Sequence, residues 1–193
     1  MAQDVISDFA VEFKVSGDNQ AVNQEKGDFL SYAYKGKKMS MVLVNKMVDM
    51  HMIYDAEAKK GLLLNSMQGG AAKIASELTE EAMAFENAAI ELEPLDGSKR
   101  LNGYKCQGAK FQHGKKSIEI WYTTKLKPFD FEFEGYFFNQ LDGFPLLMIE
   151  TSSAGVLTSK ATKVTLEVED NLFDQTIPEG YTKISFEDLN GGK

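Results

Sequence analysis

Alternation of apolar and polar residues over the first third of the chain constrains the fold more than any other feature. In the first such stretch, apolar side chains fall on every second residue: Phe9, Val11, Phe13 and Val15. A period of two residues places them on one face of an extended strand. Residues 29–34, 39–44 and 47–54 continue the pattern after turn-forming segments, and residues 62–64 begin another strand. Spacings of about 8–12 residues between such strands predict an antiparallel meander.

The middle of the chain departs from this alternation. Residues 71–93 are rich in Ala, Glu and Met and poor in β-branched residues. Apolar residues recur there at steps of three and four: Ile74, Leu78, Ala82, Phe85, Ala89 and Leu92. Because that spacing lines one face of a helix, and Pro94 would end it, we expect at least one helix in this segment. A mobile insertion is the alternative that the same composition allows.

Strand patterns return after this segment. Residues 104–111 and 117–123 flank a polar turn at 112–115, which is typical of a hairpin. Residues 128–141 are rich in aromatic side chains and begin with Pro128, so they predict a short helix.

The last part of the chain continues the strand pattern. Residues 144–151 and 161–168 predict two long paired strands, and residues 173–181 predict a loop that carries Phe and Ile toward the core. No internal repeat or low-complexity linker divides the sequence. We therefore expect a single domain over residues 1–193.

The composition excludes several classes of function. The chain has a formal net charge of -8, and its lysines are scattered among the acidic residues. Nucleic acids and anionic membranes are bound through clustered Lys and Arg, so we expect neither as a partner. No run approaches the roughly 18–20 apolar residues of a transmembrane helix. At 193 residues the chain can bury a core without a metal, and its one cysteine, Cys106, allows no internal disulfide.

The first residues predict an exported protein. Ala2-Gln3 is typical of what remains after a signal peptide is cleaved behind a small residue, with Met1 added in its place. The expected location is therefore the periplasm, or otherwise outside the cytoplasm, with the signal peptide removed from this sequence.

Residues 39–55 hold five of the nine methionines and one of the two histidines, and three interpretations fit them. The first is Cu(I) binding, because thioether and imidazole are soft ligands. In a strand, however, Met50 and Met52 share one face while His51 points to the other. A copper site would then need Met39 and Met41 on a neighbouring strand. The second interpretation is a flexible apolar surface that accepts lipid chains, and the third is an ordinary sheet core.

Signals of catalysis are weak. Ser152 and Ser153 do not lie in a G-x-S-x-G turn, and the chain has no phosphate-binding glycine loop and no H-E-x-x-H. Cys106 and His113 lie at opposite ends of one predicted strand, so we expect Cys106 to be a buried structural thiol. Other candidates fit ordinary structural roles: a solvated face for Asp130, Glu132 and Glu134, surface or hydrogen-bonded positions for His51 and His113, and a core or cavity wall for Trp121. We expect no enzyme, no cofactor and no metal.

Four segments occur in the order found in a family of uncharacterised exported bacterial proteins: NGYKC at 102–106, IWYT at 120–123, DGFPL at 142–146 and IPEGY at 177–181. The chain resembles this family, a domain of unknown function, over residues 29–181. That family is in turn distantly similar to the LolA/LolB-like superfamily of periplasmic lipoprotein carriers and outer-membrane lipoprotein receptors.

The resemblance implies an α+β, mainly β fold. A strongly curved antiparallel sheet would form an unclosed barrel, and one to three helices would cover its concave face around a cavity for acyl chains. The carriers lock a closed lid with a specific arginine. The one arginine of this chain, Arg100, falls in a predicted turn, so that role is not carried over.

These observations together predict a non-enzymatic exported protein that binds a hydrophobic ligand, either a lipid or a lipoprotein acyl chain. The ligand would lie between the strands of residues 39–54 and a lid from residues 71–91 or 129–141. The predicted ligand-binding residues are Met39, Met41, Met50, Met52, Trp121, Phe133 and Phe137. The alternatives are a structural or interaction module of the cell envelope with a protein partner, and a Cu(I)-binding protein.

Overall fold

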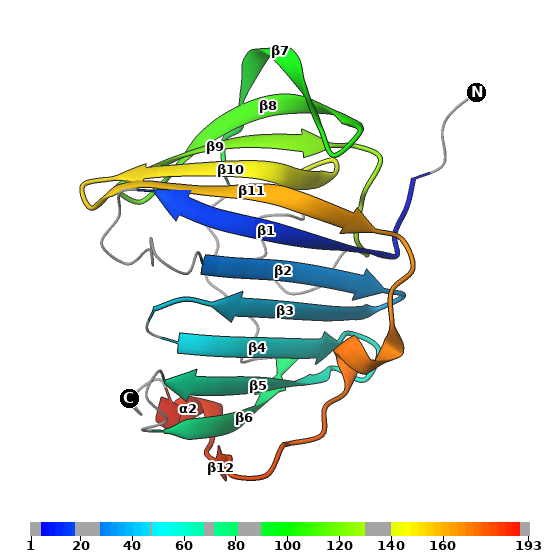
Figure 1. Ribbon diagram of the computed structural model, residues 1–193, viewed down its shortest axis with the longest axis vertical. Helices are drawn as coiled ribbons and strands as arrows, with labels where there is room; N and C mark the ends of the chain where they lie inside the picture. Colours follow the sequence, from blue (N-terminus) through cyan, green and yellow to red (C-terminus); the bar gives the residue numbers. More distant parts are fainter. Residues whose placement is uncertain are drawn as a thin grey trace.

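A single sheet of twelve strands forms the framework of the protein (Figure 1). The computed structural model describes residues 5–17, 28–46, 48–67, 72–80, 90–129 and 140–189. In chain order the strands are β1 (Phe9–Gly17), β2 (Asp28–Lys35), β3 (Lys38–Val44), β4 (Val48–Asp55), β5 (Lys60–Met67), β6 (Lys73–Thr79), β7 (Glu93–Leu101), β8 (Tyr104–His113), β9 (Lys116–Thr123), β10 (Phe144–Ser152), β11 (Gly155–Thr165) and β12 (Thr182–Lys183). Their order across the sheet is β12-β6-β5-β4-β3-β2-β1-β11-β10-β9-β8-β7. The sheet is open, with β12 and β7 as its edges.

The meander predicted from the first third of the chain is confirmed. Strands β1 to β5 lie side by side in chain order, and each pairs antiparallel with the next. The predicted hairpin joins β8 to β9, and β10 and β11 overlap the two long strands predicted near the end. The pairing of β1 with β11 connects the two halves of the chain into one sheet.

The predicted fold class, α+β with one to three helices over the concave face, is wrong. Two helical elements lie within the described residues, η2 (Asp170–Phe173) and α2 (Phe186–Leu189), and each has four residues. Seven residues of the helix predicted over residues 71–93 form the strand β6, which pairs antiparallel with β5. Ile74 and Leu78 are four residues apart, a spacing that satisfies a helix and a strand equally, and pairing with β5 decides the outcome.

The remaining parts of the two predicted helices have different outcomes. Glu93, the last residue of the helix predicted over residues 71–93, is the first residue of the edge strand β7. Pro94 stands in that strand, where its missing N–H costs little because the strand has a neighbour on one side only. Residues 81–89 and 130–139 lie outside the described residues.

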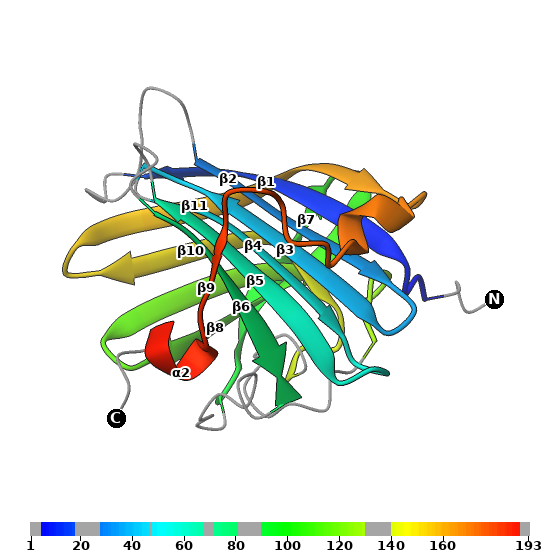
Figure 2. The ribbon, with the colours of Figure 1, turned by 90° about the horizontal axis from the view of Figure 1, so that it is seen from below.

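One face of the sheet is concave and encloses the main core. The ring of Phe144 on β10 lies 5.6 Å from the ring of Tyr34 and 5.9 Å from that of Tyr32, both on β2. Strands β10 and β2 are separated by β11 and β1, which is about 14 Å in a flat sheet. Side chains can meet across that distance where their face curves inward. We call this the inner face, and the curvature of the sheet is visible in Figures 1 and 2.

The opposite, outer face of β2–β6 is covered by residues 166–181, which we call the strap. It runs from the end of β11 to β12 across one side of the sheet (Figure 1). Val168 and Phe173 of the strap are buried in a cluster with Ala33 and Ile53. Further along, Ile177 and Tyr181 pack against a second cluster, which is formed by Leu62, Leu64 and Ala75. The loop predicted at residues 173–181 therefore does bring apolar side chains to a core.

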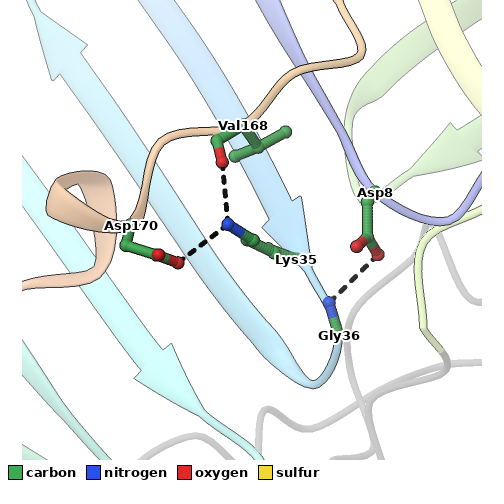
Figure 3. Close-up of polar contacts among 5 residues, drawn as sticks. All are labelled: Asp8, Lys35, Gly36, Val168 and Asp170. Carbon is green, nitrogen blue, oxygen red and sulfur yellow. Dashed lines mark hydrogen bonds and ion pairs between the residues drawn. The ribbon is translucent and has the colours of Figure 1, made fainter.

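Polar contacts fix the beginning of the strap (Figure 3). The Lys35 ammonium donates hydrogen bonds to the Val168 carbonyl at 3.0 Å and to the Asp170 carboxylate at 2.8 Å. Nearby, the Gly36 N–H donates to the Asp8 carboxylate at 3.0 Å. Because the Asp170 side chain is 90% exposed, the ion pair contributes little stability, and the apolar contacts of the strap carry most of it.

Candidate ligand-binding face

The side chains on the inner face form three rows that run across the strands from β1 to β6. The closed row contains Phe9, Tyr34, Met39, Tyr54, Gly61 and Leu78. The middle row contains Val11, Tyr32, Met41, Met52, Leu63 and Ser76. The open row contains Phe13, Leu30, Leu43, Met50, Asn65 and Ile74. Residues opposite each other in paired strands share a face, so each row is a line of neighbouring side chains.

Burial decreases from the closed row to the open row. All six residues of the closed row are buried. In the two other rows, six neighbouring apolar residues on β2, β3 and β4 are only half-buried: Leu30, Tyr32, Met41, Leu43, Met50 and Met52. We call these six residues the methionine patch. The concave face therefore has a sealed end and an end at which apolar side chains reach solvent.

Residues near the hairpin turns close the sealed end. Leu126 is fully buried, and the segment that contains it is bridged to Ile6 by two backbone hydrogen bonds. Phe129 lies 5.3 Å from the Lys37 ammonium, beside the turn between β2 and β3. These contacts explain why Met39, which is next to that turn, is fully buried.

Three of the four predicted methionines lie together in the methionine patch. Met41 is directly opposite Met52, and Met50 is opposite Leu43 in the same pair of strands. Met39 shares their face but belongs to the core. His51 lies on the outer face, as the strand period predicts, and its Nε2 forms a 2.9 Å hydrogen bond with Ser40 Oγ. The role of these methionines as ligand-binding residues stays a prediction.

Trp121 lies on the other side of the sheet from the methionine patch. Its neighbour Ile120 is opposite Met148, which is opposite Ser159, which is in turn opposite Val15 of the inner face. Successive residues of a strand point to opposite faces, so Trp121 points outward. Its indole N–H donates to Glu119 Oε1 at 2.6 Å.

The outward-facing Trp121 is nevertheless buried, because neighbouring side chains cover it. The Lys99 ammonium lies 4.0 Å from the centre of its ring. Gly108 leaves the space on which the ring rests, since a Cβ there would lie 3.1 Å from two indole carbons. Trp121 nevertheless belongs to the same buried cluster as Met39, and its role as a ligand-binding residue stays a prediction. The other two predicted ligand-binding residues, Phe133 and Phe137, lie outside the described residues.

The aromatic centre of the inner face was not identified from the sequence as a unit. Tyr32 and Tyr34 stack with a 6.4 Å separation of ring centroids, and both contact Phe144. Burial raises the pKa of the Tyr32 hydroxyl, so this group is neutral at physiological pH. The alternation of Tyr32 and Tyr34 in one strand is a usable signal that both share a face, but their contact with Phe144 depends on the curvature.

Catalytic and metal chemistry find little support among the described residues. Cys106 is fully buried, and desolvation raises the pKa of its thiol, against a weaker lowering by a hydrogen bond with the Leu101 backbone. A protonated buried thiol is a poor nucleophile. Cys106 and His113 lie in β8 seven residues apart, as predicted. In the part of the chain that the structure describes, no three His, Cys, Asp or Glu side chains are grouped as metal ligands.

No helix of the described residues is long and apolar enough to span a membrane.

Comparison with known proteins identifies a fold and no family. No protein-family model matches the chain, and no curated protein matches it. Two crystal forms of PNGF-II have a similar fold, with TM-scores of 0.55 and 0.52, 14% and 16% sequence identity, and coverage of 95% and 94% of this chain. The chain spans 32% of the length of PNGF-II in both. A beta-barrel-like protein of a domain of unknown function from Brucella abortus has a TM-score of 0.41 and 8% identity, over 84% of this chain and 99% of that one.

Proposed function

We propose that the protein is a non-enzymatic, exported binding protein that holds a hydrophobic ligand on the inner face of its sheet. The observation that carries this proposal is the methionine patch, because it is a contiguous, half-buried apolar surface on a concave face. Monomeric soluble proteins rarely leave such surfaces without a partner. An open sheet with a sealed end and an apolar open end is compatible with a ligand-binding cavity.

The chemistry of the patch suits a flexible apolar chain. Met41, Met50 and Met52 have unbranched side chains that adapt to ligands of varied shape. Each ligand methylene that they bury would contribute about 0.8 kcal/mol. A ligand chain of eight methylenes would therefore contribute about 6 kcal/mol before the entropic cost of association. A lipid or the acyl chain of a lipoprotein has this character.

The finer parts of the proposal rest on the sequence segments at 102–106, 120–123, 142–146 and 177–181. Through their resemblance they support an exported, periplasmic location and a distant relationship to lipoprotein carriers and receptors. Transfer of lipoproteins is not part of the proposal, because the lid arginine of the carriers has no counterpart.

Native mass spectrometry of the purified protein, followed by organic extraction and lipid analysis, tests the proposal. We expect a co-purifying acyl lipid that is lost from the double variant Met50→Gln/Met52→Gln. Gln matches Met in length and brings a polar amide to the patch. The matched control is Met67→Gln, since Met67 is 56% exposed at the end of β5 and lies outside the patch. This control should retain the lipid.

Two results would contradict the proposal. One is a bare protein mass that does not change when dioleoylphosphatidylglycerol or a fatty acid is added. The other is a lipid that remains bound in the double variant as well as in the wild type. The first result would favour the interaction module of the cell envelope, with the methionines as ordinary core residues, and the second would place the bound lipid outside the methionine patch.

Cu(I) binding is a second candidate, and the register of β3 and β4 favours it. A copper site needs methionines on neighbouring strands. Met41 on β3 is directly opposite Met52 on β4, and Met50 lies two residues from Met52 on the same face. Stoichiometric uptake of Cu(I) in reducing buffer, abolished in the double variant and retained in Met67→Gln, would support copper. Absence of uptake would remove this candidate.

A further inference from the structure

A cavity lies away from the methionine patch, where β7 and β9 end and β8 begins, near Ile6. Its volume is about 810 Å³. Three of the residues that line it are cationic: Arg100, Lys105 and Lys125. None of its lining residues among those that the structure describes is acidic. This composition is unusual in a chain whose net charge is -8.

The turn between β7 and β8 places two of these cations together. Asn102 and Gly103 both have positive φ angles, 48° and 84°, as a two-residue type I′ hairpin turn requires. Such a turn fixes the register, so that Arg100 is directly opposite Lys105. Arg100 Nη1 also donates a 3.1 Å hydrogen bond to the Gly103 carbonyl, which holds the guanidinium beside the turn.

Like charges directly opposite each other destabilise a strand pair. Other lysines of the same two strands are neutralised: Lys99 pairs with Glu119 at 3.7 Å, and Lys110 pairs with Glu93 at 2.9 Å. Neither Arg100 nor Lys105 forms an ion pair with any residue in the described ranges. The unfavourable pair therefore stands at the wall of the cavity.

Aromatic and apolar groups form much of the remaining wall. Tyr104 and Tyr122 line the cavity together with Ile6 and the buried Cys106. Tyrosine rings bind flat apolar groups, while an Arg guanidinium presents a planar fork of donors to a carboxylate or phosphate.

We propose that this cavity binds a small molecule with an anionic group attached to an aromatic or short apolar body. The anion is held between Arg100 and Lys105, and the apolar body lies against Tyr122. This ring is on the same face as Lys105 because Tyr122 is opposite Gln107. This site is separate from the methionine patch and takes a ligand of different chemistry, so it goes beyond the proposed function.

Isothermal titration calorimetry with phenyl phosphate tests the site on the full chain. We expect saturable binding that weakens with added NaCl and falls at least about tenfold in Arg100→Gln and in Lys105→Gln, because each variant removes a charge-assisted hydrogen bond. The matched control is Lys110→Gln, which removes the same charge from the same strand outside the cavity. It should bind like the wild type, and so should Met50→Gln/Met52→Gln.

Two partial ligands are titrated for comparison: inorganic phosphate, which has only the anionic group, and phenol, which has only the aromatic body. Both should bind at least about tenfold more weakly than phenyl phosphate, since each lacks one half of the recognised structure. The proposal is overturned if phenyl phosphate does not bind at millimolar concentration, if either partial ligand binds equally well, or if Lys110→Gln loses as much affinity as Lys105→Gln. Urea unfolding of Lys105→Gln excludes misfolding as the cause, because removing one of two opposed charges should leave its midpoint at or above that of the wild type.

Discussion

Ser40 and Ser76 are both buried serines of the sheet, but their hydroxyl groups have different surroundings. Ser40 Oγ forms a hydrogen bond with His51 on the outer face. Ser76, which is 1% exposed at the end of the middle row, has no hydrogen-bond partner for its Oγ among the described residues. A buried hydroxyl without a partner is destabilising, whereas a paired one contributes about 1 kcal/mol.

Substitution of the two serines should therefore have opposite effects on the free energy of unfolding. We expect Ser40→Ala to lower it by about 1–2 kcal/mol, because His51 is left partly buried without its partner. Ser76→Ala should leave it unchanged or raise it by up to about 1 kcal/mol. Urea unfolding monitored by circular dichroism measures both. An equal loss in the two variants would show that the Ser76 hydroxyl is satisfied in solution.

His51 should make stability depend on pH. Burial lowers the pKa of its imidazole, and a hydrogen bond with the Leu172 backbone partly opposes that shift. Between the folded pKa and the unfolded value of about 6.5, the unfolded chain binds more protons than the folded one. The free energy of unfolding should then fall as the pH drops below about 6.5. In His51→Gln this contribution is absent, so the urea midpoint should change less between about pH 7.5 and pH 5.5 than in the wild type. Identical changes would contradict the shift.

The sequence predicts side-chain direction along one strand better than the meeting of side chains from different strands. The opposite orientations of Met50 and His51 follow from the strand period alone. That Met41 meets Met52 requires the register of a hairpin. The contact of Phe144 with Tyr32 requires the curvature of the whole sheet, which no local pattern specifies. The predicted grouping of Trp121 with the methionines depends on such long-range information and stays a prediction.

At the scale of elements, the strap is the main cover of the outer face between β2 and β6. Phe173 is 8% exposed in a cluster with Ala33, Ile53 and Val168, whereas its neighbour Leu172 is 36% exposed. We expect Phe173→Ala to lower the free energy of unfolding by about 3 kcal/mol, because it leaves a cavity between strap and sheet. Leu172→Ala, the control in the same short helix, should cost less than about 1 kcal/mol. Urea unfolding compares the two, and equal losses would mean that the strap is not packed as described.

The strand β6 shows why one element was misidentified from the sequence. Its burial largely alternates: Ser76 and Leu78 are buried on the inner face, whereas Lys73, Glu77 and Thr79 are exposed on the outer face, where Ala75 alone is buried. A helix and a strand both bring Ile74 and Leu78 to one side, so spacing does not separate the two. The high helix propensity of Ala and Glu then favours the wrong element. Strand β1 was predictable from its sequence, because its apolar and polar residues alternate unambiguously and it contains β-branched residues.

At the scale of the whole molecule, one continuous sheet connects regions that are far apart in sequence. The pairing of β1 with β11 joins residues separated by about 150 positions, such as Glu12 and Lys163. The inner core extends along almost the entire sheet, from Leu78 on β6 to Phe111 on β8. Because the largest core is shared between the two halves, they should not unfold independently.

Cooperative unfolding can be tested with probes on the two halves. The lone Trp121 reports on β9 through its fluorescence, and far-ultraviolet circular dichroism reports on the strands as a whole. We expect the two urea transitions of the wild type to coincide. In Phe173→Ala both midpoints should fall by the same amount, although the strap packs against β2 and β4 and lies four strands or more from β9 in the sheet order. If the fluorescence midpoint stayed unchanged while the circular dichroism midpoint fell, the sheet would consist of two separately stable parts. Coincident shifts would mean that loss of a contact on β2 and β4 destabilises β9 to the same extent, because a two-state protein has a single free energy of unfolding.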